Sequence, residues 1–174
     1  MNAAGPDAVV RILGIDPGSR ATGYGLVELR GRKLRYLESG VIRSTDQDFN
    51  LRLAHIFAAA QAFIDEAKPD ELAIERVFVK KNPDSALKLG AARAAVICAS
   101  FALGPEVHEY AAREIKQALT GRGSADKEQV QHMVKAILNL QGSQFGLDES
   151  DALAIAICHA HSRDARQAVK AASA

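Results

Sequence analysis

The sequence has few of the features that mark membrane, secreted or metal–thiolate proteins. Its 174 residues include two cysteines, no tryptophan and only 5% aromatic residues. No apolar run reaches the roughly 18 residues that suggest a membrane-spanning helix, and the opening MNAAGPDA lacks the basic and apolar regions of a signal peptide. Cys98 and Cys158 lie in apolar stretches without metal-ligand spacing, which predicts two buried, reduced thiols. We therefore expect a cytoplasmic protein with no membrane association.

An overall charge bias is also missing, since 22 basic residues face 21 acidic ones. The basic residues are nevertheless unevenly placed. Five lie between Arg76 and Arg93 against one acid, and five lie between Arg113 and Lys135 against three acids. Two basic segments in a neutral chain favour a polyanion-binding face beside an acidic site, with solvated helix surfaces as the alternative.

The apolar patterns predict a single α/β domain over residues 9–163. Short β-branched and apolar runs predict strands at 9–16, 22–29, 33–42, 71–78 and 105–110. Helical spacing predicts helices at 51–67, 84–103, 109–120, 125–140 and 148–163. A strand hairpin followed by strand–helix alternation favours a mixed sheet of about five strands with helices on both faces. Residues 1–8 and 164–174 are expected to be flexible termini.

Four carboxylates stand where such a sheet can bring them together. Asp16 ends the first strand in GIDPGS, and Glu75 interrupts the apolar strand LAIERVF. Asp148 and Asp151 share one face of the last helix because they are three residues apart. Each has a simpler explanation alone: a turn residue at 16, an ion pair between 75 and 76, and helix capping at 148 and 151.

Taken together, the four acids indicate a cation site. Strand ends and helix starts meet at one edge of an α/β sheet, where ligands usually bind. Four carboxylates in one cleft repel each other and raise their pKa values unless a cation neutralises them. Mg²⁺ prefers such oxygen ligands, and two ions roughly 3.5–4 Å apart can promote phosphodiester hydrolysis. Beside a basic face, this combination predicts a nuclease.

Five segments, in this order and spacing, resemble the RuvC-type Holliday junction resolvases, a branch of the RNase H-like nucleases. They are ILGIDPGSRATGYG, AIERVF, KNPDSALKLGAAR, YAAREIKQALTGRGSADKEQVQHMV and DESDALAIAICHAH. The resemblance implies an RNase H-like fold and a catalytic tetrad that binds two Mg²⁺ ions per subunit, with Mn²⁺ able to substitute: Asp16, Glu75, Asp148 and Asp151. It also implies a homodimer that nicks two strands of like polarity at a four-way DNA junction, in recombination and repair. The ends left would be 5′-phosphate and 3′-hydroxyl, and the RuvA–RuvB branch-migration complex would be a partner.

The same resemblance assigns DNA contacts to one aromatic and several basic residues. Phe78 would stack on bases at the opened junction, with core packing as the alternative. Lys116 and Lys127 match positions expected to contact phosphates. Further candidates for DNA contacts are Lys80, Lys81 and Arg122. Solvated side chains are the alternative for each. Arg76 stands where an uncharged residue is expected.

Three further features have open interpretations. The predicted helix at 84–103 is apolar almost all round from residue 91 onward, which suggests packing against a second subunit or a central core position. His159 and His161 do not share a helix face, so we predict surface or dimer-facing histidines rather than joint metal ligands. Gly-Ile-Asp-x-Gly also opens actin-like ATPases and sugar kinases, but those chains are much longer. A catalytically silent junction-binding module would have lost at least one of the four acids, and all four are present.

Overall fold

The computed structural model describes residues 8–77, 83–101 and 104–172, and within them no helix combines the length and apolar character needed to cross a membrane. The elements follow the chain in the order β1 (Val9–Asp16), β2 (Ala21–Arg30), β3 (Lys33–Arg43), α1 (Phe49–Ala67), β4 (Glu71–Glu75), α2 (Pro83–Phe101), β5 (Glu106–Tyr110), α3 (Ala112–Thr120), α4 (Lys127–Ile137) and α5 (Leu147–Ala172).

The strands form one mixed sheet in the order β3-β2-β1-β4-β5. The first three strands are antiparallel neighbours, and β1, β4 and β5 run parallel to each other. The β2–β3 turn is tight because Gly31 adopts a φ of 58°, a conformation that glycine reaches without steric cost. The five-stranded mixed sheet predicted from the sequence is confirmed.

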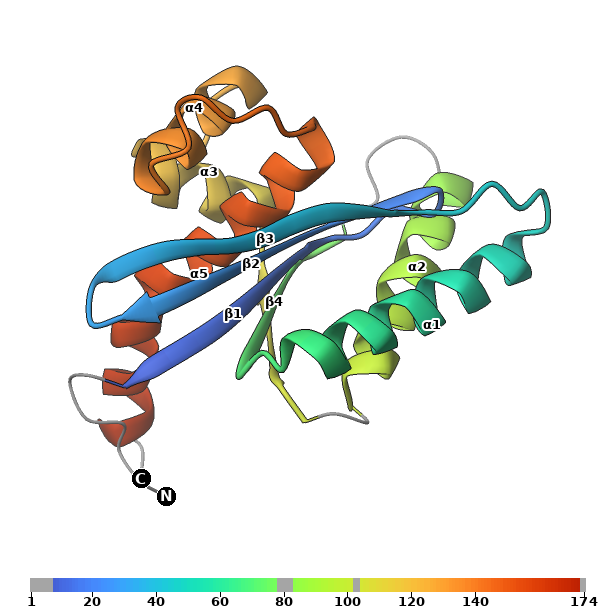
Figure 1. Ribbon diagram of the computed structural model, residues 1–174, viewed down its shortest axis with the longest axis horizontal. Coiled ribbons are helices and arrows are strands. Elements are labelled where there is room, and N and C mark those ends of the chain that lie inside the picture. Colours follow the sequence, from blue (N-terminus) through green and yellow to red (C-terminus); the bar gives the residue numbers. More distant parts are fainter. Residues whose placement is uncertain (1–7, 78–82, 102–103, 173–174) are drawn as a thin grey trace.

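Helices cover both faces of the sheet, as Figure 1 shows. Helices α1 and α2 pack on one face and α3, α4 and α5 on the other, each side with its own apolar cluster. Strand β4 contributes Leu72 and Ile74 to the cluster on the α1–α2 side and Ala73 to the cluster on the α3–α5 side. Because side chains alternate along a strand, Glu71 and Glu75 at the two ends of β4 lie on the α5 face.

Helix α5 lies unusually close to the sheet because glycines line the strands beneath it. A Cβ atom on Gly14 would lie 2.1 Å from the carbonyl oxygen of Ala152. A Cβ on Gly23 would lie 2.1 Å from the carbonyl oxygen of Asp148. No side chain fits in these gaps, so the backbone of α5 rests directly on β1 and β2.

Several element boundaries differ from the predicted ones, and four of these differences involve β4, β5 and α5. Strand β4 ends at Glu75 rather than at residue 78, and Glu109 belongs to β5 rather than to a helix. Helix α5 begins at Leu147, where Ser150 N–H donates to the carbonyl of Gly146, so Asp148 lies inside the first turn and is not the cap. The helix also continues to Ala172, since its alanine-rich end has high helix propensity; the segment predicted to be irregular is helical.

Helix α2 is buried along one face only. Ala92, Val96 and Ala99 are buried, whereas Leu87 and Phe101 are 74% and 71% exposed. Cys98 is exposed in the single chain, so the prediction of two buried thiols is correct for Cys158 and wrong for Cys98. The helix packs on α1, and its buried residues join the apolar cluster on that side of the sheet.

Candidate active site

The ends of two parallel strands bring the first two carboxylates together. Strands β1 and β4 are neighbours in register, with Ile15 opposite Ile74. Asp16 and Glu75 are the next residues of each strand, so they lie side by side at the same edge of the sheet. Both line a cavity of about 300 Å³.

The first turn of α5 adds the other two acids. Asp151 lines the same cavity as Asp16 and Glu75. Gly23 pairs with Asp16 across β1 and β2 and lies directly under the backbone of Asp148. The glycine therefore fixes how closely the start of α5 approaches the end of β1. The structure thus brings together all four acids predicted from the sequence.

Their crowding has an electrostatic consequence at Asp16. Burial, together with the charges of Asp151, Glu75 and Asp148, raises the pKa of Asp16 from 3.8 to about 7, although the charge of Lys127 acts in the opposite direction. An all-oxygen set of ligands with this much repulsion suits a hard divalent cation such as Mg²⁺ or Mn²⁺.

Two basic side chains predicted to contact DNA reach the same cavity. Lys116 on α3 and Lys127 at the start of α4 both line it. The Lys127 ammonium donates a 2.8 Å hydrogen bond to Oδ2 of Asp151, which raises the pKa of Lys127. Asp126 caps α4 by accepting from the Gln129 N–H at 2.8 Å, and this cap holds Lys127 at the first helical position.

The other predicted DNA contacts are placed differently. Arg122 lines a separate cavity of about 520 Å³ with Glu128 and His132. Phe78, Lys80 and Lys81 lie outside the described residues.

Arg76, the residue that departs from the expected pattern, points to a neighbouring strand. Its guanidinium donates to the Glu109 carbonyl at 3.4 Å, and its Nε lies 3.9 Å from a Glu109 carboxylate oxygen. Glu109 also pairs with Arg93 of α2. Arg76 therefore belongs to a contact between β4, β5 and α2. It lines a second cavity, of about 240 Å³, to which Asp16 and Glu75 also contribute.

Sequence reasoning missed Arg43 as a member of the site. Its Nη2 atom lies 3.9 Å from Oδ2 of Asp148, at the end of β3. The residue is one of many surface arginines in the sequence, and only the pairing of β3 with β2 shows that it ends beside α5.

The prediction for His159 is wrong, whereas His161 is exposed as expected. His159 is 1% exposed and its Nδ1 lies 2.7 Å from the Tyr110 hydroxyl. It lies in a stretch of α5, residues 152–160, in which every residue is buried. The apolar run before His159 is a sequence signal for this burial, but the partners of His159 on other elements have no such signal.

An RNase H-like sheet with four converging carboxylates and basic side chains at its edge defines a class, the RNase H-like nucleases. Residues 12–159 match the family model described as crossover junction endodeoxyribonuclease RuvC. A relative of that description from Methylococcus capsulatus is 53% identical over 155 residues, covering 89% of this chain and 93% of the relative. One from Pseudoalteromonas translucida is 56% identical over 151 residues, covering 87% and 86%. The chain therefore belongs to the RuvC family of crossover junction endodeoxyribonucleases.

Solved structures agree with this assignment. Thermus thermophilus RuvC in complex with a Holliday junction substrate has 35% sequence identity and a TM-score of 0.83, covering 91% of this chain and 96% of that one. The yeast mitochondrial Holliday junction resolvase Ydc2 has a TM-score of 0.66 over 91% of this chain and 82% of its own, and at 13% identity it shares the fold alone. The family, fold and enzyme class expected from the sequence are confirmed.

Proposed function

We propose that this chain resolves Holliday junctions by hydrolysing phosphodiester bonds in the cavity lined by Asp16, Glu75 and Asp151, with Asp148 beside it. The observation that carries the proposal is the convergence of four carboxylates at this cavity, where burial and the charges of the other three acids raise the pKa of Asp16 to about 7. Desolvation and repulsion by like charges make an ionised carboxylate at this position unfavourable, and a bound cation would remove that cost. The relative from Thermus thermophilus, whose structure holds a Holliday junction substrate, supports the choice of DNA.

The four carboxylates would hold two Mg²⁺ ions per subunit, with Mn²⁺ as a substitute. Asp16 is the candidate to contact both ions, because the charges of the acids at 75, 148 and 151 all act on it. When bound, such ions lower the pKa of the attacking water and stabilise the leaving oxygen. The expected products carry 5′-phosphate and 3′-hydroxyl ends.

Basic side chains at the rim would position the DNA backbone. Lys127 forms an ion pair with Asp151 at 2.8 Å. A cation bound by Asp151 would compete for that carboxylate and leave the Lys127 ammonium available to bind a phosphate. Lys116 from the neighbouring helix and Arg43 from the β3 end would bind phosphates on either side of the scissile bond.

A homodimer would place two such cavities on one junction. One side of α2 is exposed at residues 87, 94, 98 and 101. The last three follow residue 87 by seven, eleven and fourteen positions, a spacing that places all four on the same side of a helix. Two-fold pairing through this face would match the two-fold symmetry of a four-way junction, as paired nicks in strands of like polarity require. The RuvA–RuvB complex is the expected partner in branch migration.

The first test is cleavage of a synthetic mobile four-way junction with and without Mg²⁺, compared on a denaturing gel with linear duplex of the same sequence. We expect symmetric, metal-dependent nicks in the junction alone. Asp16→Asn and Asp148→Asn should bind the junction without cutting it. Glu149→Gln is the matched control, because Glu149 neighbours Asp148 but accepts a hydrogen bond from Ser39.

Two results would overturn the proposal. Parental cleavage rates in both aspartate variants would remove the four acids from the chemistry. Tight junction binding without any cut in Mg²⁺ or Mn²⁺ would make the chain a silent junction-binding protein.

A further inference from the structure

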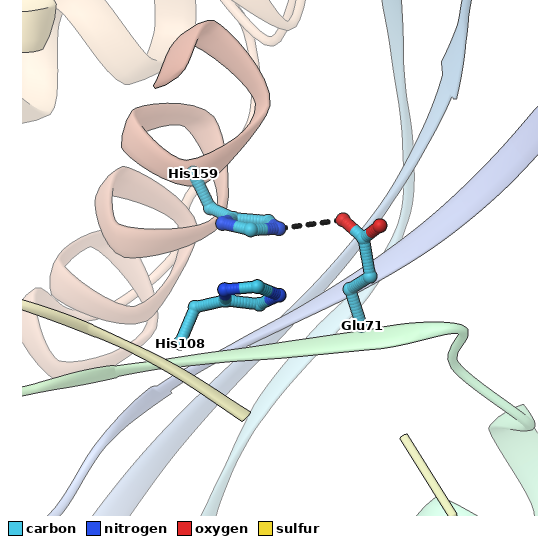
Figure 2. Close-up of side chains that lie close together, drawn as sticks. All are labelled: Glu71, His108 and His159. Atoms are coloured by element: carbon cyan, nitrogen blue, oxygen red, sulfur yellow. Dashed lines mark hydrogen bonds and ion pairs between the residues drawn. The ribbon is translucent and has the colours of Figure 1, made fainter. Parts of the chain in front are cut away.

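A second group of potential metal ligands lies at the far end of β4 from the active site. Glu71 of β4, His108 of β5 and His159 of α5 converge there, and Figure 2 shows both imidazole rings directed toward the carboxylate. Glu71 and Glu75 are four residues apart on one strand, which separates them by about 13 Å. His159 follows Asp151 by eight helical residues, or about 12 Å. The cluster is therefore distinct from the catalytic carboxylates.

The three side chains are close and largely shielded from water. One potential ligand atom from each lies within 4.8 Å of those from the other two. His159 Nε2 is 2.6 Å from a Glu71 carboxylate oxygen, and the two imidazole rings stack with centroids 4.3 Å apart. Only 1% of the His159 side chain, 11% of His108 and 15% of Glu71 is exposed. A second carboxylate, Glu106, lies 3.8 Å from His108 Nε2.

We propose that Glu71, His108 and His159 bind a transition-metal cation of the Zn²⁺ class, separate from the hard cations of the active site. Two imidazoles and a carboxylate are a ligand set that suits Zn²⁺, Ni²⁺ or Cu²⁺ and does not suit Mg²⁺. In a tetrahedral zinc site with bonds of about 2.1 Å, ligand atoms lie about 3.4 Å apart. The ligand atoms here lie between 2.6 and 4.8 Å apart, so small side-chain rotations suffice. Water or Glu106 would complete the coordination.

The surroundings of His159 resemble the outer shell of known metal sites. Its Nδ1 lies 2.7 Å from the Tyr110 hydroxyl. Metal-ligating histidines commonly donate their second ring N–H to such an oxygen, which fixes the ring orientation. Tyr110 is itself 2% exposed, so this contact holds the Nε2 edge of His159 toward Glu71.

Glu71 is a charged ligand at neutral pH. Burial opposes its ionisation, but hydrogen bonds from His159 and Arg163 outweigh that effect and lower its pKa from 4.5 to about 2. Arg163 Nε lies 3.0 and 3.1 Å from the two carboxylate oxygens. Its positive charge competes with a metal ion for the same carboxylate, so removal of that charge should tighten metal binding.

The test uses Co²⁺ as a spectroscopic probe, because a tetrahedral nitrogen–oxygen site gives Co²⁺ a much stronger visible absorption than an octahedral oxygen site. The protein carries Asp16→Asn, Asp148→Asn and Asp151→Asn to disable the active-site cation site, and excess Mg²⁺ is present. We expect one Co²⁺ per chain, a visible band that Zn²⁺ abolishes by displacement, and an increase in melting temperature on addition of Zn²⁺.

Two variants should move the affinity in opposite directions. His108→Phe should weaken Co²⁺ binding at least tenfold and remove the thermal shift, whereas Arg163→Met should strengthen binding. His161→Phe, an exposed histidine of the same helix, is the matched control and should leave the band unchanged. Circular dichroism and junction binding verify that each variant folds.

The proposal is overturned if no tetrahedral band forms, or if the band survives His108→Phe. In either case the cluster is an ion-pair network of Tyr110, His159, Glu71 and Arg163 that ties three elements together. Because no step of the test reads DNA cleavage, its result is independent of the proposed nuclease function.

Discussion

At the scale of single residues, Asp16 combines functional value with a cost in stability. Its folded pKa of about 7 lies above its usual value of 3.8, so the folded protein without metal holds this proton more tightly than the unfolded chain. Stability therefore falls as pH rises from about 4 to 7, and the full cost is present above pH 7. A cation removes the cost by favouring the carboxylate.

The first prediction follows for Asp16→Asn in EDTA. The variant should be more stable than the parent at pH 8, by an amount on the order of 1–4 kcal/mol, and the gap should shrink toward pH 5. Chemical unfolding at the two pH values measures it. Mg²⁺ should stabilise the parent more than the variant, while junction cleavage by the variant falls on the order of 10²-fold or more. A gap independent of pH would contradict the assignment of the buried charge.

The pKa of Glu71 is shifted in the opposite direction to that of Asp16, which supports a second prediction. Its folded pKa of about 2 lies below its usual 4.5, so its contribution is complete above about pH 5 and is lost as pH falls toward 2. Glu71→Gln in EDTA should lower the free energy of unfolding at pH 7 by an amount on the order of 1–3 kcal/mol, and by less at pH 3. Urea unfolding at pH 7, 5 and 3 measures the loss.

A matched substitution sets the baseline for this measurement. Glu66→Gln removes one carboxylate from an exposed position of α1. A Glu71→Gln loss no larger than the Glu66→Gln loss would show that the contacts of Glu71 with His159 and Arg163 do not stabilise the fold.

At the scale of elements, the contact between β2 and α5 determines the shape of the active site. A Cβ at position 23 would lie 2.1 Å from the Asp148 carbonyl oxygen. Because that oxygen belongs to the backbone of α5, the clash can be relieved only by moving the start of the helix or the strand beneath it. Gly23→Ala should therefore displace the first turn of α5 and lower cleavage on the order of 10²-fold, because a shift near 1 Å is enough for such a loss. Rates on the synthetic junction at saturating Mg²⁺ measure it.

Gly142→Ala is the control for that substitution. Nothing lies within 4 Å of a Cβ at position 142, which is in the loop before α5. We expect a parental cleavage rate there. An equal loss in both variants would point to general destabilisation rather than to displacement of Asp148.

The sequence predicts elements best where local chemistry decides them. The first three strands are found within about one residue, because alternating apolar runs end at glycine-bearing turns. The end of β4 is missed, since VF resumes the apolar pattern after Glu75 and Arg76, whereas the strand ends at Glu75. The end of α5 is missed for a related reason, because an alanine-rich tail without an apolar stripe can still be helical.

The same distinction applies to the two candidate sites. The four acids can be predicted because each marks a strand end or a helix start, and parallel topology brings such positions to one edge. The cluster of Glu71, His108 and His159 cannot, because its members carry no common local signal. Its members meet only through the register of β4 with β5 and the rotation of α5.

At the scale of the whole molecule, the helices on the two faces of the sheet present different kinds of surface. The α3–α5 side carries the acids of α5 together with the lysines of α3 and α4, whereas the α2 side presents an apolar surface. Exposed leucine and phenylalanine at both ends of one helix are costly in a monomer unless a partner covers them. A dimer through α2 would leave both active-site edges open to DNA.

The last prediction concerns Leu87→Glu with Phe101→Glu. Both side chains are more than 70% exposed in the single chain, so the double variant should fold normally but repel its copy across the proposed dimer interface. Sedimentation should show a monomer at concentrations where the parent is a dimer. Leu51→Glu, the control, introduces a negative charge at an exposed leucine of α1 and should leave the oligomeric state of the parent unchanged.

Cleavage gives a second readout of the same variant. A monomer brings one active site to each junction, so junctions with a single nick should accumulate under conditions in which the parent makes two nicks. If the double variant stays dimeric and still cuts in pairs, the subunits meet elsewhere, and the exposed face of α2 has another role.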